Sequence, residues 1–324
     1  MSRPDDPITP TDVDRMRAFA AAVLTGRPAP SAPEELVRRG NLGPLAYSLG
    51  LLEHRDDYAA SLIVSLRRQA VLAEVLATLR TVGVRAALLK GCGLTGTIYP
   101  DPATRPMLDL DLLVPAPRMA DAARALYAIG FARAGRARTL SGYSHAVAFS
   151  RADMVVELHR NIVQHSRTAI RAGDLWRRAG PDPLGSGGER LDRVDELLVC
   201  MVHVARHELA VPLLNYVDVA RLTERLDAAE RAELDRRARE FEVTRAIAAV
   251  RSMTELLAMG ATGHPALGLG STVLPTTDDV LRGVRPRRAR QIAQKLLLTD
   301  GPLQIAGLGF AHAWTALDGL RRER

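Results

Sequence analysis

The sequence predicts an α+β fold: a mixed β-sheet flanked by helices, with helices before it and an all-helical domain after it. Helical periodicity covers most of the first 81 residues and of the chain after residue 192. Apolar runs typical of strands lie between residues 84 and 158. Aromatic residues are only 4%, and Ala, Leu and Arg dominate, which favours helices. We expect three domains: an N-terminal helical cover (1–82), an α/β core (83–180) and a C-terminal helical domain (190–324).

The N-terminal section is predicted to be helical and to carry no chemistry. Residues 1–10 are polar and rich in proline, as in a loose leader. Asp12 can cap a helix that ends near Leu24, because a side-chain oxygen there accepts from a free backbone N–H. After a Pro-rich turn at Gly26–Pro33, further helices are expected over residues 33–40, 42–52 and 56–81.

A glycine-rich turn follows the first predicted strand, Val84–Leu89. The turn is Lys90-Gly-Cys-Gly93, and a helix is expected to run from it to about Tyr99. A strand that leads through glycines into a helix is a natural phosphate cradle. Gly91 and Gly93 would let the backbone approach an anion, and Lys90 would supply charge. An ordinary tight turn has the same glycine spacing.

A loop with three prolines, Tyr99–Pro106, leads into the second predicted strand. Arg105 ends this loop just before that strand, where its side chain can reach a bound phosphate. A surface arginine without a ligand is the alternative.

Two aspartates lie in the second predicted strand, Pro106–Val114. Because side chains alternate along a strand, Asp109 and Asp111 share one face, while Leu108, Leu110 and Leu112 share the other. Two carboxylates in an apolar strand are costly to desolvate without compensation. The simplest compensation is a cation with oxygen ligands, such as Mg²⁺. An edge strand with a solvated acidic face is the alternative.

A third acid lies in a predicted hairpin. After a helix over Pro117–Ile129, strands at Tyr143–Ser150 and Met154–Leu158 flank a short turn. Glu157 and His159 share one face of the second strand, and Glu157 has apolar neighbours on both sides. An exposed cross-strand glutamate would give the same pattern.

A linker is predicted at Gly180–Glu189, and the chain after it is predicted to be helical. The first expected helix begins at Asp192 or Asp195 and ends at Glu208. The others cover residues 213–226, 227–239, 242–259, 276–298 and 303 to the end. His203 and His207 are four residues apart on the first helix, a spacing that can hold a metal. No third ligand is evident, so a polar pair lining a cleft and ordinary packing stay open. Asp218 lies among apolar residues and can orient one histidine.

The order of these segments resembles the nucleotidyltransferase fold of the DNA polymerase β type. It is more closely similar to a large bacterial family of mostly uncharacterised nucleotidyltransferases, over residues 60–260. The matching segments are Leu88-Leu-Lys-Gly91, Tyr99-Pro100, Arg105-Pro106, Asp109-Leu-Asp111-Leu-Leu-Val114, Gly130-Phe131, Val156-Glu-Leu-His159, Leu198–His207 and Val217-Asp218. The wider superfamily usually has Gly-Ser in the phosphate turn, whereas this chain has Gly91-Cys92.

The resemblance implies a site for Mg²⁺ and a nucleoside triphosphate, with ATP as the expected nucleotide. Its metal ligands and catalytic acids would be Asp109, Asp111 and Glu157. Lys90, Gly91, Gly93 and Arg105 would bind the nucleotide, and His159, His203, His207 and Asp218 would lie on the acceptor side. The implied reaction transfers a nucleoside monophosphate to a hydroxyl of a small molecule or peptide, for example in natural-product biosynthesis. A kinase-like phosphotransferase and a non-catalytic, antitoxin-type binding protein on the same fold are the alternatives.

Composition narrows the expected partners. The net charge of +7 suits anionic partners, although an arginine-rich proteome would give it too. Lys/Arg runs are not interleaved with aromatic residues, so nucleic acid is not an expected partner. No apolar run reaches the length of a membrane span. Cys92 and Cys200 form no disulfide framework or zinc motif, so we expect a cytoplasmic protein. The sequence leaves the oligomeric state open.

Overall fold

The computed structural model of the protein describes residues 9–28, 34–53, 55–134, 145–163, 168–268, 270–301 and 305. The α-helices of these residues are α1 (Pro10–Thr25), α2 (Glu34–Arg39), α3 (Gly43–Ser48), α4 (Arg55–Thr81), α5 (Lys90–Leu94), α6 (Met119–Ala128), α7 (Ala172–Trp176), α8 (Arg193–Arg206), α9 (Leu213–Glu224), α10 (Ala228–Glu240), α11 (Thr244–Met259), α12 (Thr277–Leu281) and α13 (Arg288–Leu297). The strands are β1 (Ala87–Leu88), β2 (Leu110–Leu113), β3 (Ala132–Arg133), β4 (Ala146–Arg151), β5 (Met154–His159), β6 (Gly180–Pro181) and β7 (Glu189–Arg190).

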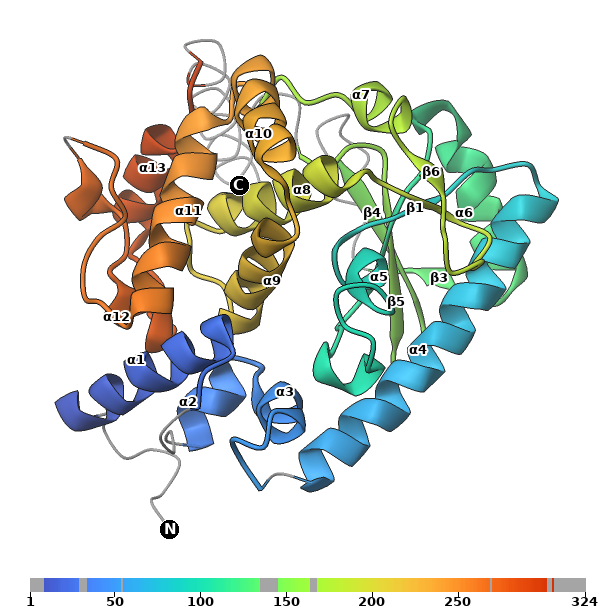
Figure 1. Cartoon of the computed structure of the whole chain (residues 1–324). Helices are drawn as coiled ribbons and strands as arrows, with labels where there is room; N and C mark the ends of the chain where they lie inside the picture. The colour runs from blue at the N-terminus through green and yellow to red at the C-terminus, as the bar shows by residue number, and fades with distance from the viewer. Residues whose placement is uncertain are drawn as a thin grey trace, which may run out of the picture.

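The strands form one mixed sheet in the order β3-β4-β5-β2-β1-β7-β6. Strand β2 pairs antiparallel with β1 and parallel with β5. Figure 1 shows α4 along one side of this sheet and the helices from α8 onward gathered on the other side. The predicted α+β class, with a sheet flanked by helices and a helical C-terminal part, is confirmed.

The register of β2 against β5 brings the predicted acids together. Asp111 is paired with Glu157, and Leu113 with His159. Because side chains alternate along each strand, Leu110 and Leu112 turn to the opposite face. Both leucines are buried in an apolar cluster with side chains of α4 and α6. The acids therefore project from the face that looks toward the helical half.

A second apolar cluster fills the helical half. It joins α1, α8, α9 and α11 with residues of β1, and α1 packs directly against α9 and α11. In Figure 1, α1 lies below α11, next to the C-terminal helices rather than next to the sheet. The N-terminal helices are thus divided, since α4 covers the sheet. None of the helices in the described segments is both long and apolar enough to cross a bilayer.

The segment Gly180–Glu189, predicted to be a linker, is instead part of the sheet. Strand β6 pairs antiparallel with β7, and β7 runs parallel to β1. Its glycines serve the connecting turn, where Gly185 and Gly187 have φ values of 72° and 83° that favour glycine. The division into three domains stays a prediction.

Several predicted boundaries also differ. Thr9, not Asp12, is the N-cap of α1, and Asp12 completes a capping box three residues later. Strand β2 begins only at Leu110, so Leu108 is 77% exposed instead of buried with the other leucines. The helix after the glycine turn ends at Leu94 rather than near Tyr99.

Residues 276–298 form two helices, α12 and α13, instead of one. Gly283 and Pro286 lie between them and interrupt the helix. Residues 1–8 of the predicted leader and, apart from Ile305, the predicted helix from residue 303 to the end fall outside the described residues, whereas Thr9 and Pro10 belong to the start of α1.

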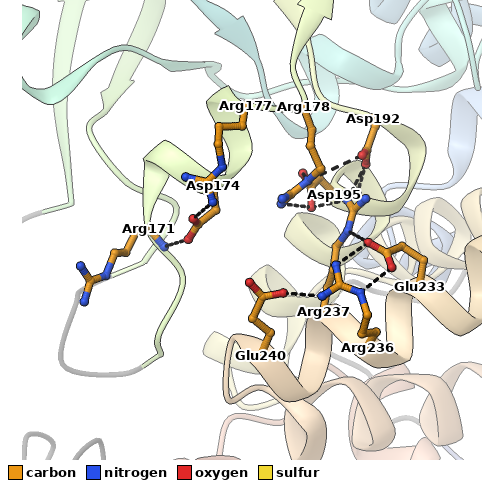
Figure 2. A network of polar contacts seen from close by, with 10 residues as sticks. All are labelled: Arg171, Asp174, Arg177, Arg178, Asp192, Asp195, Glu233, Arg236, Arg237 and Glu240. Carbon is orange, nitrogen blue, oxygen red and sulfur yellow. Dashed lines mark hydrogen bonds and ion pairs between the residues drawn. The ribbon is translucent and has the colours of Figure 1, made fainter.

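An ion-pair network ties the start of α8 to its surroundings (Figure 2). Asp195 is fully buried and accepts hydrogen bonds from the Arg178 guanidinium at 2.8 and 3.0 Å. The Arg237 guanidinium on α10 lies 2.7 Å from Asp195 and 2.8 Å from Asp192, and it also contacts Glu233. These five residues are called the Asp195 network. It joins α8 and α10 to the segment before β6.

Candidate functional site

Five charged or titratable side chains converge where β2 and β5 meet α5. His159 Nε2 lies 2.7 Å from Asp111 Oδ1 and 3.4 Å from Glu157 Oε2. The Lys90 ammonium donates to the same Asp111 oxygen at 2.8 Å. Asp109, directly before β2, borders the cavity that Asp111 and Lys90 also line. These five residues are called the acid cluster.

Local chain geometry sets the position of Lys90. It lies two residues after the end of β1 and has φ 47°, a left-handed conformation that is uncommon outside glycine. The Leu89 amide donates to the Asp111 carbonyl at 3.1 Å, which fixes the turn against β2. The predicted glycine turn therefore brings Lys90 to the aspartates, although β1 and β2 are separated by a long loop.

The two glycines of α5 are required by close packing on opposite sides. A Cβ at Gly91 would lie 2.7 Å from Met107 Cγ, and a Cβ at Gly93 would lie 2.8 Å from Glu196 Oε1. Gly91 lines the cavity of the acid cluster. Gly93, predicted beside it as a phosphate contact, packs against Glu196 instead. Its role toward a nucleotide stays a prediction.

The acids of the cluster differ in their protonation. Burial raises the pKa of Asp109 to about 6, and the neighbouring Asp111 charge adds to the rise. Burial acts in the same direction on Asp111, but hydrogen bonding from His159 and the charge of Lys90 outweigh it, so the pKa of Asp111 lies below its usual value. The hydrogen bond from His159 lowers the pKa of Glu157. Such separated pKa values are typical of functional sites.

The acids that His159 contacts favour its cationic form. Burial disfavours the charged imidazolium, but the hydrogen bonds to Asp111 and Glu157 prevail, and the pKa of His159 is raised. Its other ring nitrogen, Nδ1, is buried without a hydrogen-bond partner among the described residues.

The acid cluster opens into a cavity of about 200 Å³ between the sheet and the helices. Three parts of the chain meet there: the turn before α3, the segment from Lys90 to Asp111, and the helices α8 and α9. The lining residues outside the acid cluster are Asn41, Gly91, Arg105, Pro106, Met107, Leu108, His203, Pro212, Leu214 and Asn215.

The two histidines of α8 differ in their surroundings. His203 lines the cavity, and burial together with the Lys90 charge lowers the pKa of His203 well below its usual value. His207 is exposed at the end of α8, with its ring centroid 4.7 Å from that of His203. Only His203 therefore fits the prediction of a cleft-lining side chain.

The prediction that Asp218 orients a histidine is wrong. Its carboxylate accepts a hydrogen bond from the Tyr99 hydroxyl at 2.7 Å and from Arg105 Nε and Nη2 at 2.9 and 2.7 Å. Arg105, predicted to face a phosphate, is thus held across to α9, and its remaining Nη1 donates to the Pro106 carbonyl at 2.8 Å. A phosphate contact of Arg105 stays a prediction.

Some residues at the site escaped sequence reasoning. Asn41 lies in a turn and Asn215 in the first turn of α9, where no pattern marks them as site residues, and alternation predicts Leu108 on the apolar face of the strand. The His145 ring centroid lies 5.7 Å from that of His159, because β4 places Ala146 opposite His159. The hairpin register alone would have indicated this proximity.

The donors of the acid cluster suit a divalent cation. Asp111, Glu157 and His159 each offer a ligand atom, and these atoms all lie within 4.8 Å of one another. Carboxylate oxygens favour Mg²⁺, and a histidine nitrogen widens the choice to transition metals. From the sequence we expect a metal ion to compensate the charge of the carboxylates. In the structure, Lys90 and His159 supply part of this compensation.

Comparison with known proteins gives one clear match. The family model described as uncharacterised nucleotidyltransferase matches residues 49–258. No curated protein matches the chain significantly. Nucleotidyltransferases act on a nucleoside triphosphate and generally use a divalent metal. The matched region is more than half of the chain and contains every residue of the acid cluster and the cavity wall formed by α8 and α9. The chain therefore belongs to the uncharacterised nucleotidyltransferase family.

Proposed function

We propose that this enzyme transfers a nucleoside monophosphate from MgATP to a hydroxyl group of a small molecule or peptide. The observation that carries the proposal is the register of β2 and β5. It sets Asp111 beside Glu157, and Asp109 borders the same cavity as Asp111. Among the described residues, the ion-pair partners of these three carboxylates are Lys90 and His159, so the site favours added positive charge.

The metal ligands in this proposal are Asp109, Asp111 and Glu157, with His159 close enough to join them. A divalent ion bound there supplies charge neutralisation for the triphosphate and lowers the pKa of an acceptor hydroxyl. Lys90 carries a mobile ammonium with three donors, so it can contact a phosphate oxygen when Asp111 takes another partner. His159 keeps Asp111 ionised, which is the form that binds a cation.

The acceptor would lie against the helical wall of the cavity. Burial and the Lys90 charge favour the neutral form of His203, so its imidazole can accept a hydrogen bond from an acceptor hydroxyl. Asn41 and Asn215 offer hydrogen bonds, and the exposed Leu108 offers an apolar contact. Arg105 contributes by holding α9, and with it Asn215, against the core through Asp218.

Nucleotide titrations test the proposal. MgATP and MgCTP are titrated by calorimetry into the wild type, the double variant Asp109→Asn/Asp111→Asn and the control Asp121→Asn, which removes an acid of α6 outside the cavity. We expect binding to the wild type and the control and its loss in the double variant, whose fold is checked by circular dichroism. Binding that survives the double change contradicts the assigned ligands.

The reaction itself is identified by its products. Pyrophosphate release and an acceptor heavier by a nucleoside monophosphate support nucleotidyl transfer. ADP release and an acceptor heavier by one phosphate would indicate the kinase-like alternative. Failure to release either product with a broad panel of hydroxyl acceptors would favour a binding protein. A natural-product acceptor and a cytoplasmic location stay predictions.

A further inference from the structure

A second cavity, of about 480 Å³, lies beyond α5 from the acid cluster. Its walls come from the residues after α5, the strands β6 and β7, the start of α8 and the end of α9. It shares no lining residue with the cavity of the acid cluster. Its volume falls in the range of sites for small ligands, roughly 300–1,000 Å³.

Most charged side chains of this second cavity have partners within the protein. Arg190 Nε contacts Asp182 at 2.5 Å. Arg193 Nη2 contacts Glu230 at 2.7 Å. Arg178 and Asp192 belong to the Asp195 network. These groups build the walls and hold them in place.

Two lining residues of opposite charge, Glu196 and Arg225, are less well paired. The Glu196 side chain is only 13% exposed, and its nearest cation, Arg190 Nη1, is 3.9 Å away. No hydrogen bond reaches its carboxylate from the described residues. Arg225 is exposed at the end of α9, and its guanidinium makes no hydrogen bond or ion pair with any described residue. A poorly paired buried carboxylate is costly, so a cationic ligand group would be favoured there.

We propose that this cavity binds an aliphatic amino acid or a similar small zwitterion. The ligand's ammonium pairs with Glu196, and its carboxylate accepts a bidentate contact from Arg225. Its aliphatic part packs against Ile98, Leu191 and Leu222, which line the same cavity. A free phosphate fits poorly, because Glu196 would repel it. A divalent cation fits poorly too, because Glu196 is the only lining acid without a close partner among the described residues.

The protonation of Glu196 supports this assignment. Burial raises the pKa of Glu196 to about 7. The charges of Arg190 and Arg225 lower this pKa, whereas those of Asp218 and Asp182 raise it further. The ammonium needs the ionised carboxylate. Raising the pH from 6 to 8 increases the ionised fraction about tenfold for a pKa near 7, so binding is expected to tighten by the same factor.

Calorimetry with three matched probes tests the proposal on the full chain, without metal or nucleotide. L-leucine carries both charges, isoamylamine lacks the carboxylate, and 4-methylpentanoate lacks the ammonium. The proteins are the wild type, Glu196→Gln, Arg225→Gln and the control Glu224→Gln, which changes an exposed neighbour outside the cavity. We expect L-leucine to bind the wild type and the control at least tenfold more tightly than either single-charge probe.

Each variant has its own expected signature. Glu196→Gln weakens L-leucine binding at pH 8 at least tenfold and removes its pH dependence. Arg225→Gln weakens binding similarly but keeps the pH dependence. The proposal is overturned if L-leucine does not bind at millimolar concentration, if a single-charge probe binds as tightly, or if both variants bind like the control. These readouts need no nucleotide, so they stand or fall independently of the proposed transferase activity.

Discussion

The acid cluster and the Asp195 network are built from similar charged side chains but differ in how completely their acids are paired. Each surrounds a buried aspartate with two cationic side chains: Lys90 and His159 around Asp111, and Arg178 and Arg237 around Asp195. In the Asp195 network every acid contacts at least one arginine (Figure 2). In the acid cluster three acids share one lysine and one histidine.

This imbalance separates a site from a structural contact. Guanidinium groups are always charged and grip carboxylates with a rigid fork, so the Asp195 network is closed and fixed. An ammonium and an imidazole exchange partners more readily, and Asp109 keeps a pKa of about 6 because burial and the Asp111 charge outweigh the charge of Lys90. Buried acids that outnumber their cations at a cavity therefore mark the place where an added cation stabilises the protein.

The largest expected effect comes from Asp111→Asn. We expect the transfer rate to fall about a thousandfold or more, because a ligand that supports several kcal/mol of transition-state stabilisation is lost. Urea unfolding should show a smaller loss of stability than for Asp195→Ala, because Glu157 and Asp109 remain as partners for His159 and Lys90. Rates are measured by pyrophosphate release. A variant that keeps a tenth of the wild-type rate would contradict the comparison.

Asp195→Ala is expected to give the opposite result. Removing this acid leaves Arg178 and Arg237 short of a buried partner, so the free energy of unfolding should fall by about 3–5 kcal/mol. The transfer rate per folded molecule should stay unchanged. Asp235→Ala, which removes a half-exposed acid paired with Arg251, is the control and should cost below about 1 kcal/mol. Equal losses of stability in Asp195→Ala and Asp235→Ala would contradict the structural role of the Asp195 network.

Arg105→Lys decides to which kind of contact Arg105 belongs. A lysine cannot reproduce the two-pronged contact with Asp218, so we expect stability to fall by about 2 kcal/mol. The KM for the nucleotide should not change if the contact is structural. A raised KM with unchanged stability would instead support the phosphate contact predicted from the sequence.

Glu196→Gln should change the pH dependence of stability. The pKa of Glu196 is raised from 4.5 to about 7, so the folded protein retains a proton that the unfolded chain loses between these values. The wild type therefore loses stability as pH rises from about 4.5 to 7. Relative to wild type, the variant should gain roughly 2–3 kcal/mol at pH 8 and almost nothing near pH 4. Urea unfolding at several pH values measures this, with Glu224→Gln as control.

Local patterns predicted the parts of the site that depend on one segment. Period-two alternation placed Asp111 opposite the leucines and put Glu157 on the same face as His159. The glycine spacing predicted the turn that carries Lys90. The resemblance to a known family then indicated that these segments meet, which alternation alone does not determine because strand pairing depends on the whole fold.

Contacts between distant segments were not predictable in this way. Arg105 and Asp218 are 113 residues apart in the chain, and each reads locally as an isolated charge. The segment Gly180–Glu189 has the composition of a linker. Its two ends nevertheless form β6 and β7, which pair with each other, and β7 also pairs with β1. Leu108 was misplaced because β2 begins two residues later than the apolar pattern does.

The buried pair of Arg105 and Asp218 limits how the molecule can be dissected. Cutting the chain between the sheet and α8 would expose Arg105 in one fragment and Asp218 in the other, together with the apolar surface that surrounds each of them in the intact protein. Separately expressed halves should therefore be insoluble or unfolded alone, and co-expression should restore a single particle. Exchanging the helical half between members of the family should give a folded protein only if the chimera retains both Arg105 and Asp218.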